Sequence, residues 1–359
     1  NTFGNGDHLM AGYIGSKAVS VNTTSATISD DLAVGGDIIT TSAGTSNVRV
    51  GVSAGSSIES GGNHNVAVGN EAGTAITTGD GNIVIGFESG HDITTGGYNL
   101  LIGWKAGDKI DTASQNVAIG DGSLSADTKG SKSVAVGSNT LNTQNFTSAT
   151  DAYNVAVGYN AGVAITTGTF NTLVGSLTGD ALTTGGRHTL MGYASGSALI
   201  DPDRNVAFGY GSLQSDTKGT KSTAVGYSAL NTQNFTSATD SFNTAVGYTA
   251  GESITTGVNN TLVGSLAGDA LTDADSNVAI GYASLSTDTL GSRSIAIGHG
   301  ALNEQNFTSA TNVENVAVGY AAGNVITTGF KNTIVGALGY DNLQNGDRNI
   351  AIGYDTTSS

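Results

Sequence analysis

The chain has 359 residues, of which 54 are glycine, one is proline and none is cysteine, and only 12% are charged. The absence of cysteine excludes disulfides and thiolate metal sites, and a hydrophobic fraction of 38% is too high for a disordered chain. With 13 Lys and Arg and a net charge of −16, the chain lacks the cations that nucleic-acid binding requires. No uninterrupted run of about 18 apolar residues is present to enter a membrane.

The chain divides into two regions. Residues 1–46 precede the first regular repeat and include "TISDDLAVGGDIITTSAG" at 27–44, so we predict a connector or cap with irregular strands there. Residues 47–359 form eighteen repeats when the chain is aligned on the glycine that ends each apolar run. Most repeats are 17 residues long, and three of them have 21. Because the chain starts with Asn1, we expect it to be a piece of a longer protein.

One repeat reads N-x-A-V-G-x-x-A-G-x-x-I-T-T-G-x-x, and we number its positions 1 to 17. Position 5 is always Gly, position 15 is usually Gly, and the single proline, Pro202, also falls at position 15. A fixed short period is the signature of a solenoid. Since two turns leave no room for a helix, we predict an all-β parallel β-solenoid or β-roll with one repeat per rung.

The repeats come in two kinds. In the common kind, position 9 is Gly and position 12 is apolar. In three repeats, position 9 is Leu (Leu124, Leu213, Leu285) and position 12 is Asp (Asp127, Asp216, Asp288). This exchange keeps the apolar volume constant, as a close-packed interior shared by neighbouring rungs demands.

Positions 2, 3 and 4 are all apolar in many repeats, as in Val66-Ala67-Val68. A continuous apolar run indicates a strand that is buried on both faces. One face can fill the interior of the coil, and we expect position 3 to face outward, where identical chains cover it. This predicted core and trimer ladder consists of Ala67, Val84, Leu101, Ala118, Ala135, Ala156, Leu173, Ala207, Ala245, Ala279 and Ala317. The alternative is a flattened single coil in which position 3 meets a loop. The asparagines of position 1 fit hydrogen-bonded ladders along the stack, with an array for ligand recognition as the alternative.

The three long repeats contain "LNTQNFTSAT" at 141–150 and 230–239, or "LNEQNFTSAT" at 302–311. Four extra residues at the same phase predict a bulge on one side of the stack. The candidate lateral contact residues are Asn142, Gln144, Phe146, Asn231, Gln233, Phe235, Asn303, Gln305 and Phe307. Each Phe either offers a platform for a glycan or tucks back to anchor its own loop, and the invariance of the loop favours the anchor.

No convincing catalytic or metal site is visible. The pairs Asp201/Asp203 and Asp273/Asp275 could serve acid–base chemistry on a glycosidic bond or hold Ca²⁺, but solvated turn aspartates are commoner. The five histidines, at positions 8, 64, 91, 188 and 299, show no metal spacing. We therefore expect no enzyme activity and no cofactor. The "ITTG" segments lack the flat T-x-T face of ice-binding solenoids, and Trp104 is expected to line the surface.

The repeats "NVAVGYNAG" and "NTAVGYTAG" resemble the head repeats of trimeric autotransporter adhesins, and still more the tail-fibre proteins of tailed bacteriophages, over about residues 47–354. Segment 27–44 resembles an element found before such shafts. The resemblance implies a homotrimeric left-handed parallel β-roll, although the period is longer than that of the adhesin repeat. Such fibres often carry a self-cleaving C-terminal chaperone, so Ser359 is either a cleavage edge or a boundary of the sequence.

From this resemblance we predict an elongated homotrimeric segment of a phage tail fibre in the virion tail, which extends and presents host-attachment surfaces. Its expected partners are further copies of itself, other tail or fibre proteins and a host-surface glycan or protein. Two alternatives stay open: the head of a bacterial trimeric surface adhesin at the cell surface, and a tailspike-type polysaccharide depolymerase.

Overall fold

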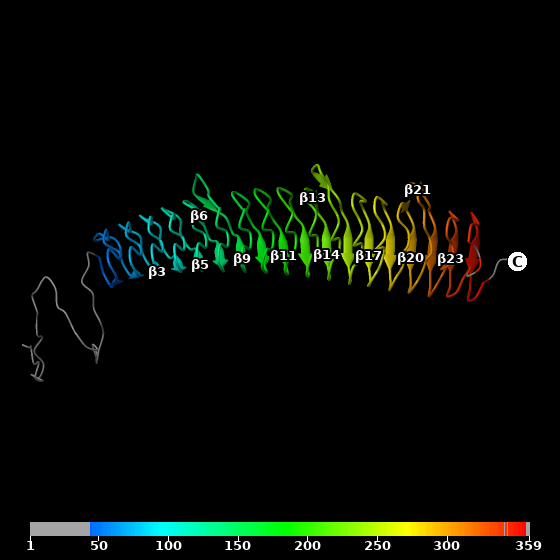
Figure 1. Ribbon diagram of the computed structural model, residues 1–359, viewed down its shortest axis with the longest axis horizontal. Helices are drawn as coiled ribbons and strands as arrows, with labels where there is room; N and C mark the ends of the chain where they lie inside the picture. The colour runs from blue at the N-terminus through cyan, green and yellow to red at the C-terminus, as the bar shows by residue number, and fades with distance from the viewer. Residues whose placement is uncertain (1–43, 341, 343, 357–359) are drawn as a thin grey trace, which may run out of the picture. The chain divides into compact units, whose positions relative to one another are not determined.

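The computed structural model describes residues 44–340, 342 and 344–356, so the predicted connector at 1–46 lies almost wholly outside the described residues. Residues 44–356 form one parallel β-solenoid, in which every rung contributes one strand to a single sheet of eighteen strands (Figure 1). This confirms the predicted all-β solenoid with about 17 residues per rung. In the described part of the chain the ordered elements are all strands, so it holds no helix that could cross a membrane.

The main sheet consists of three-residue strands, one at positions 2 to 4 of each rung. They are β1 Val48–Val50, β2 Val66–Val68, β3 Ile83–Ile85, β4 Leu100–Ile102, β5 Val117–Ile119, β7 Val134–Val136, β9 Val155–Val157, β10 Thr172–Val174, β11 Thr189–Met191, β12 Val206–Phe208, β14 Thr223–Val225, β16 Thr244–Val246, β17 Thr261–Val263, β18 Val278–Ile280, β20 Ile295–Ile297, β22 Val316–Val318, β23 Thr333–Val335 and β24 Ile350–Ile352. Six two-residue strands lie outside this sheet: β6 Gly130–Ser131, β8 Thr150–Asp151, β13 Gly219–Thr220, β15 Thr239–Asp240, β19 Gly291–Ser292 and β21 Thr311–Asn312.

Each main strand pairs in parallel with the strand of the next rung, and the register never slips. In β12 and β14, for example, Val206 lies beside Thr223 and Phe208 beside Val225. Figure 1 shows the arrows stacked side by side along the molecule. Identical positions therefore form continuous columns, and a property that the sequence repeats every 17 residues becomes a stripe on the surface or in the core.

The core of the coil is formed by positions 3, 8 and 12. In the rung that starts at Asn154, these are Ala156, Ala161 and Ile165, and all three are fully buried. The glycine at position 9 leaves the space that position 12 fills, because a Cβ on Gly162 would lie 3.0 Å from Cδ1 of Ile165 and 2.8 Å from Cδ1 of Leu173.

Where position 9 is Leu, the leucine takes over the space of position 12. Leu124, Leu213 and Leu285 are fully buried, and so are the aspartates that follow them at position 12. The predicted exchange of apolar volume is therefore confirmed.

The outward orientation predicted for position 3 is wrong. All eleven residues of the ladder listed above are fully buried inside a single chain. Since side chains alternate along a strand, positions 2 and 4 point outward instead. The apolar run gave no indication of which face was inward; the small alanine at position 3 was the clue, because the narrow interior has room for little more.

Position 5 brings the backbones of successive rungs into close contact. Its glycines adopt φ between 130° and 146°, and a Cβ on Gly209 would lie 2.1 Å from the carbonyl oxygen of Gly226. No other residue fits this approach, which explains why position 5 is always Gly.

The predicted asparagine ladder is present, but it runs mainly through backbone donors. Asn82 N–H donates to Oδ1 of Asn65 at 2.9 Å, while Asn82 Nδ2 donates to the carbonyl of Gly96 at 2.9 Å. Buried amides thus satisfy the turn at position 15 and join successive rungs. In one rung His188 replaces the asparagine: its Nε2 bonds the Pro202 carbonyl at 2.8 Å, and its Nδ1 accepts from Asn205 N–H at 3.2 Å.

Candidate interaction surfaces

Each long rung carries a lateral loop that stands out from one edge of the stack, as predicted (Figure 1). The three lateral loops are residues 142–151, 231–240 and 303–312. Each returns through a two-residue strand that pairs in parallel with the preceding rung, as β15 does with β13. In the second loop, the side chains of Thr236, Ser237 and Ala238 are exposed at the tip.

A buried polar relay anchors each loop. In the second loop, Gln233 Nε2 donates to Oδ2 of Asp216 at 2.6 Å and to Oγ of Ser222 at 2.8 Å. Asn243 Nδ2 in turn donates to Oε1 of Gln233 at 2.9 Å. The relay therefore begins at the aspartate of one rung and joins the asparagine ladder of a later one. The same relay recurs with Asp127, Gln144 and Asn154.

The aspartate also binds the backbone of the loop. Oδ1 of Asp216 accepts from the N–H groups of Gly219 at 2.9 Å and Phe235 at 3.2 Å. Burial raises the pKa of Asp216, although hydrogen bonds from Gln233 and from backbone N–H groups act in the opposite direction. Burial raises the pKa of Asp127 in the same way.

The nine candidate contact residues hold the loops in place and do not form an outward contact surface. The three glutamines are fully buried, and the three phenylalanines are only 5 to 8% exposed. Each asparagine reaches back to the preceding rung, as Asn231 Nδ2 does to the Gly211 carbonyl at 2.8 Å. Their selection as contacts was wrong because an invariant loop sequence reflects internal packing, whereas the tip residues at the exposed end carried no signal.

The paired aspartates are used as turn residues. Oδ1 of Asp203 accepts from Gly186 N–H at 2.9 Å, and Oδ1 of Asp275 accepts from Val258 N–H at 2.8 Å. Asp273 accepts from the hydroxyl of Thr256. These carboxylates tie one rung to the previous one. Within the described residues, no group of three or more His, Asp and Glu side chains could hold a metal ion, and His8 lies outside them.

The outer face of the main sheet, which we call the outer β-face, is the largest apolar surface of the described chain. It consists of positions 2 and 4 of the eighteen strands: every residue at position 4 is apolar, and position 2 is Val, Ile, Leu or Thr. Many of these side chains are exposed, including Val157 at 36%, Met191 at 41% and Val335 at 40%. An antiparallel sheet that faces water would place polar residues on such a face.

Two columns border the outer β-face. Position 6 carries exposed rings that stack from rung to rung, including Tyr193, Tyr210, Tyr227 and Tyr248 at centroid distances of 5.2 to 5.3 Å. The predicted surface position of Trp104 is confirmed, since it belongs to this column and is 53% exposed.

Position 17, on the opposite border, carries seven of the 13 basic residues of the chain: Lys132, Arg187, Arg204, Lys221, Arg293, Lys331 and Arg348. Several of them lie over rings of their own column, as Lys221 does over Phe242 at 4.9 Å. The two columns are therefore chemically different, one aromatic and one largely cationic.

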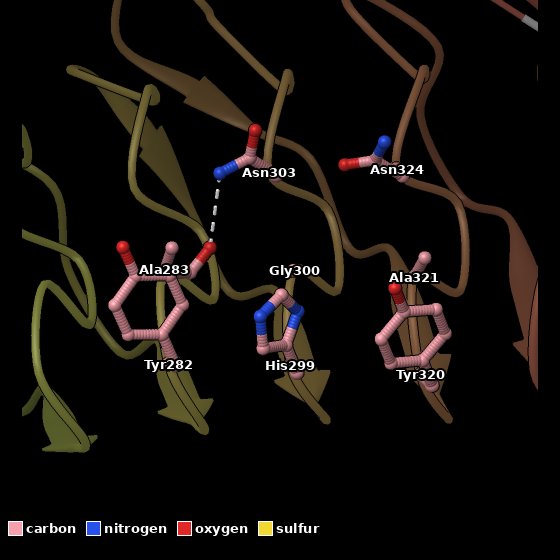
Figure 2. Close-up of a pocket in the computed structure, with 8 residues that line it drawn as sticks. All are labelled: Tyr282, Ala283, His299, Gly300, Asn303, Tyr320, Ala321 and Asn324. Atoms are coloured by element: carbon pink, nitrogen blue, oxygen red, sulfur yellow. Dashed lines mark hydrogen bonds between the residues drawn. The ribbon is translucent and has the colours of Figure 1, made fainter.

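A shallow pocket of about 370 Å³ lies beside the position-6 column. Figure 2 shows the rings of Tyr282, His299 and Tyr320 in one row, with Asn303 and Asn324 above them. Asn303 Nδ2 is already engaged with the carbonyl of Ala283 at 3.1 Å. The floor is formed by the small residues of position 7, so the pocket is an open groove between two columns of side chains.

Comparison of the chain with protein-family models, with curated proteins and with solved structures gives no match. The functional argument therefore depends on the surfaces described above and on the repeat itself.

Proposed function

We propose that this chain is a rigid structural segment of a homotrimeric fibre, and that the fibre is a bacteriophage tail fibre. The observation that carries the proposal is the outer β-face. A strip about 85 Å long and 10 Å wide, as eighteen three-residue strands imply, amounts to about 850 Å². The largest apolar patch of an ordinary monomer is about 300–600 Å², whereas about 800 Å² per partner is the size of a stable interface.

Identical chains are the simplest cover for this face. The face repeats every rung, so its partner must repeat with the same spacing, and a second copy of the chain does so by construction. Copies arranged around an axis parallel to the stack keep their rungs at equal heights. The resemblance of the repeats to tail fibres and trimeric adhesins favours three copies.

The role follows from the shape of the stack. A shaft of about 85 Å with backbone hydrogen bonds along its length holds a binding element at a distance from its base. The lateral loops present their exposed tips to the surroundings, where a host glycan or protein, or another tail protein, could bind. Three copies carry three times the −16 charge of one chain, which prevents fibres from associating side by side.

Sedimentation equilibrium tests the assembly. We expect the wild-type mass to be three times the 35.7 kDa of the chain. Substituting Val225→Asp, Val246→Asp and Val263→Asp places three carboxylates on adjacent strands of the outer β-face, and the trimer should dissociate because buried unpaired charges are costly. The control replaces the exposed threonines of position 14, Thr167→Asp, Thr184→Asp and Thr256→Asp, where Asp201 and Asp273 occur naturally. A folded monomer of the wild-type chain at micromolar concentration would refute the proposal.

The biological setting needs a separate test, because the same shaft could be the head of a bacterial surface adhesin. The complete gene and its neighbours distinguish the two: tail-structure genes beside it support the phage fibre, and a membrane anchor encoded at its end supports the adhesin. The depolymerase alternative has weaker support, since the aspartates proposed for it bind backbone and hydroxyl groups of adjacent rungs. Release of sugar from purified bacterial polysaccharide by the trimer would revive it.

A further inference from the structure

The two columns that border the outer β-face are complementary in chemistry, and this suggests how copies meet. We propose that the position-17 column of one copy packs against the position-6 column of the next copy, so that cations of one chain lie on tyrosine rings of its neighbour. The inference rests on the proposed trimer and deepens it by naming the residues that form the contact.

Position 17 of one repeat and position 6 of the next flank the same strand. Arg204 and Tyr210 lie on either side of β12, at the same level of the stack. In a closed ring of copies around a parallel axis, one edge of each subunit meets the opposite edge of its neighbour. Because all copies stand at the same height, Arg204 of one chain then faces Tyr210 of the next.

The dimensions agree with three copies. Packed sheets lie about 10 Å apart, so each outer β-face lies about 5 Å from a common axis, and three faces that enclose such an axis form a triangle with sides of about 17 Å. The three residues of a strand are too short for this side. The six residues from position 17 to position 6, when extended, span about 17 Å. The corners of the triangle therefore fall at the two columns.

The side chains at these corners suit each other. In three successive rungs the facing pairs are Arg187 with Tyr193, Arg204 with Tyr210 and Lys221 with Tyr227. The tyrosine rings are 47 to 52% exposed, and their slipped stacking leaves part of each ring face open. Arg204 is exposed and makes no ion pair with any residue in the described part of the chain. A guanidinium over a tyrosine face is a favourable contact at a partly desolvated site.

Cysteine crosslinking tests this contact on a clean background, since the natural chain has no cysteine. The double variant Arg204→Cys with Tyr210→Cys is treated with a short bis-maleimide and run on a denaturing gel. We expect covalent trimers, because every chain is linked to both neighbours. Arg204→Cys alone and Tyr210→Cys alone should give single chains only, since like positions lie at different corners. The matched control, Arg204→Cys with Thr167→Cys, should also stay uncrosslinked. Arg187→Cys with Tyr193→Cys repeats the test one rung away if the first variant misfolds.

The outcomes separate this inference from the proposed trimer. If sedimentation gives a trimer but neither double variant crosslinks, the trimer stands and the paired columns are refuted. Covalent dimers from the single variants would also refute the pairing, because they indicate a two-fold contact between like columns. A native mass of one chain would refute the trimer itself.

Discussion

The plain rungs and the loop-bearing rungs solve the same packing problem in different ways. In the plain rung from Asn171, position 12 is Leu182, which is buried in the core. In the loop-bearing rungs from Asn205 and Ser222, position 12 is Asp216 or Gln233, and the core is filled from position 9. The strands nevertheless stay in register from β11 through β14. The stack therefore depends on the strand and its glycine, whereas the rest of the rung can exchange an apolar contact for a polar relay that anchors an extra loop.

The largest effect should come from the element that both kinds of rung share. Gly175→Ala in a plain rung and Gly226→Ala in a loop-bearing rung would each place a Cβ within 2.4 Å of the next carbonyl oxygen, at φ of 138° and 142°. We expect each to cost about 3–5 kcal/mol of local stability, from a forbidden backbone angle and overpacking. Hydrogen exchange of the adjacent strands measures this.

Gly211→Ala is the control for the glycine prediction. Its φ of 60° is one that Ala194 adopts at the same position with φ of 51°, and its Cβ would meet only side-chain atoms, at 3.1 Å or more. The expected cost is about 1 kcal/mol. Equal losses for Gly211→Ala and Gly226→Ala would contradict the close-approach explanation.

How much of this could be predicted from the sequence follows from the same comparison. The strand, the invariant glycine and the exchange between Leu213 and Asp216 all repeat at a fixed phase, so the period alone predicted the solenoid, its rung length and the loops. The direction in which each side chain points does not follow from the period, and position 3 was therefore placed on the wrong face. The relay was also missed, because Asp216, Gln233 and Asn243 come together only across three rungs.

The second prediction breaks the loop-bearing rung alone. Gln233→Ala removes the donor to the buried carboxylate of Asp216 and the acceptor for Asn243. We expect the loop at 231–240 to lose about 2–3 kcal/mol of protection against hydrogen exchange, since a buried charge loses a partner. The plain rung from Asn171 should be unaffected. Thr236→Ala at the exposed tip of the same loop is the control, with an expected change below about 0.5 kcal/mol; a comparable loss there would argue against the relay.

The third prediction uses pH. Because burial raises the pKa of Asp216, the folded loop binds a proton at pH values where the unfolded chain has lost it. The contribution of this group to stability is therefore complete below the usual aspartate pKa and declines as the pH rises through the raised value, with a slope of at most about 1.4 kcal/mol per pH unit. Asp216→Asn should remove this slope from the exchange protection of residues 231–240. An unchanged slope in the variant would show that the carboxylate does not control the loop.

The smallest effect concerns a plain feature, the histidine that interrupts the asparagine ladder. Burial lowers the pKa of His188, so the folded chain refuses a proton that the unfolded chain accepts. Stability is therefore lost as the pH falls below the usual histidine value of about 6.5, by at most about 1.4 kcal/mol per pH unit. In His188→Asn, Nδ2 can donate to the Pro202 carbonyl and Oδ1 can accept from Asn205, as Asn171 does with its own neighbours. Thermal unfolding of the variant should match the natural chain at pH 7 and exceed it at pH 5. A variant that is equally acid-sensitive would mean that protonation elsewhere in the stack, and not at His188, limits its stability in acid.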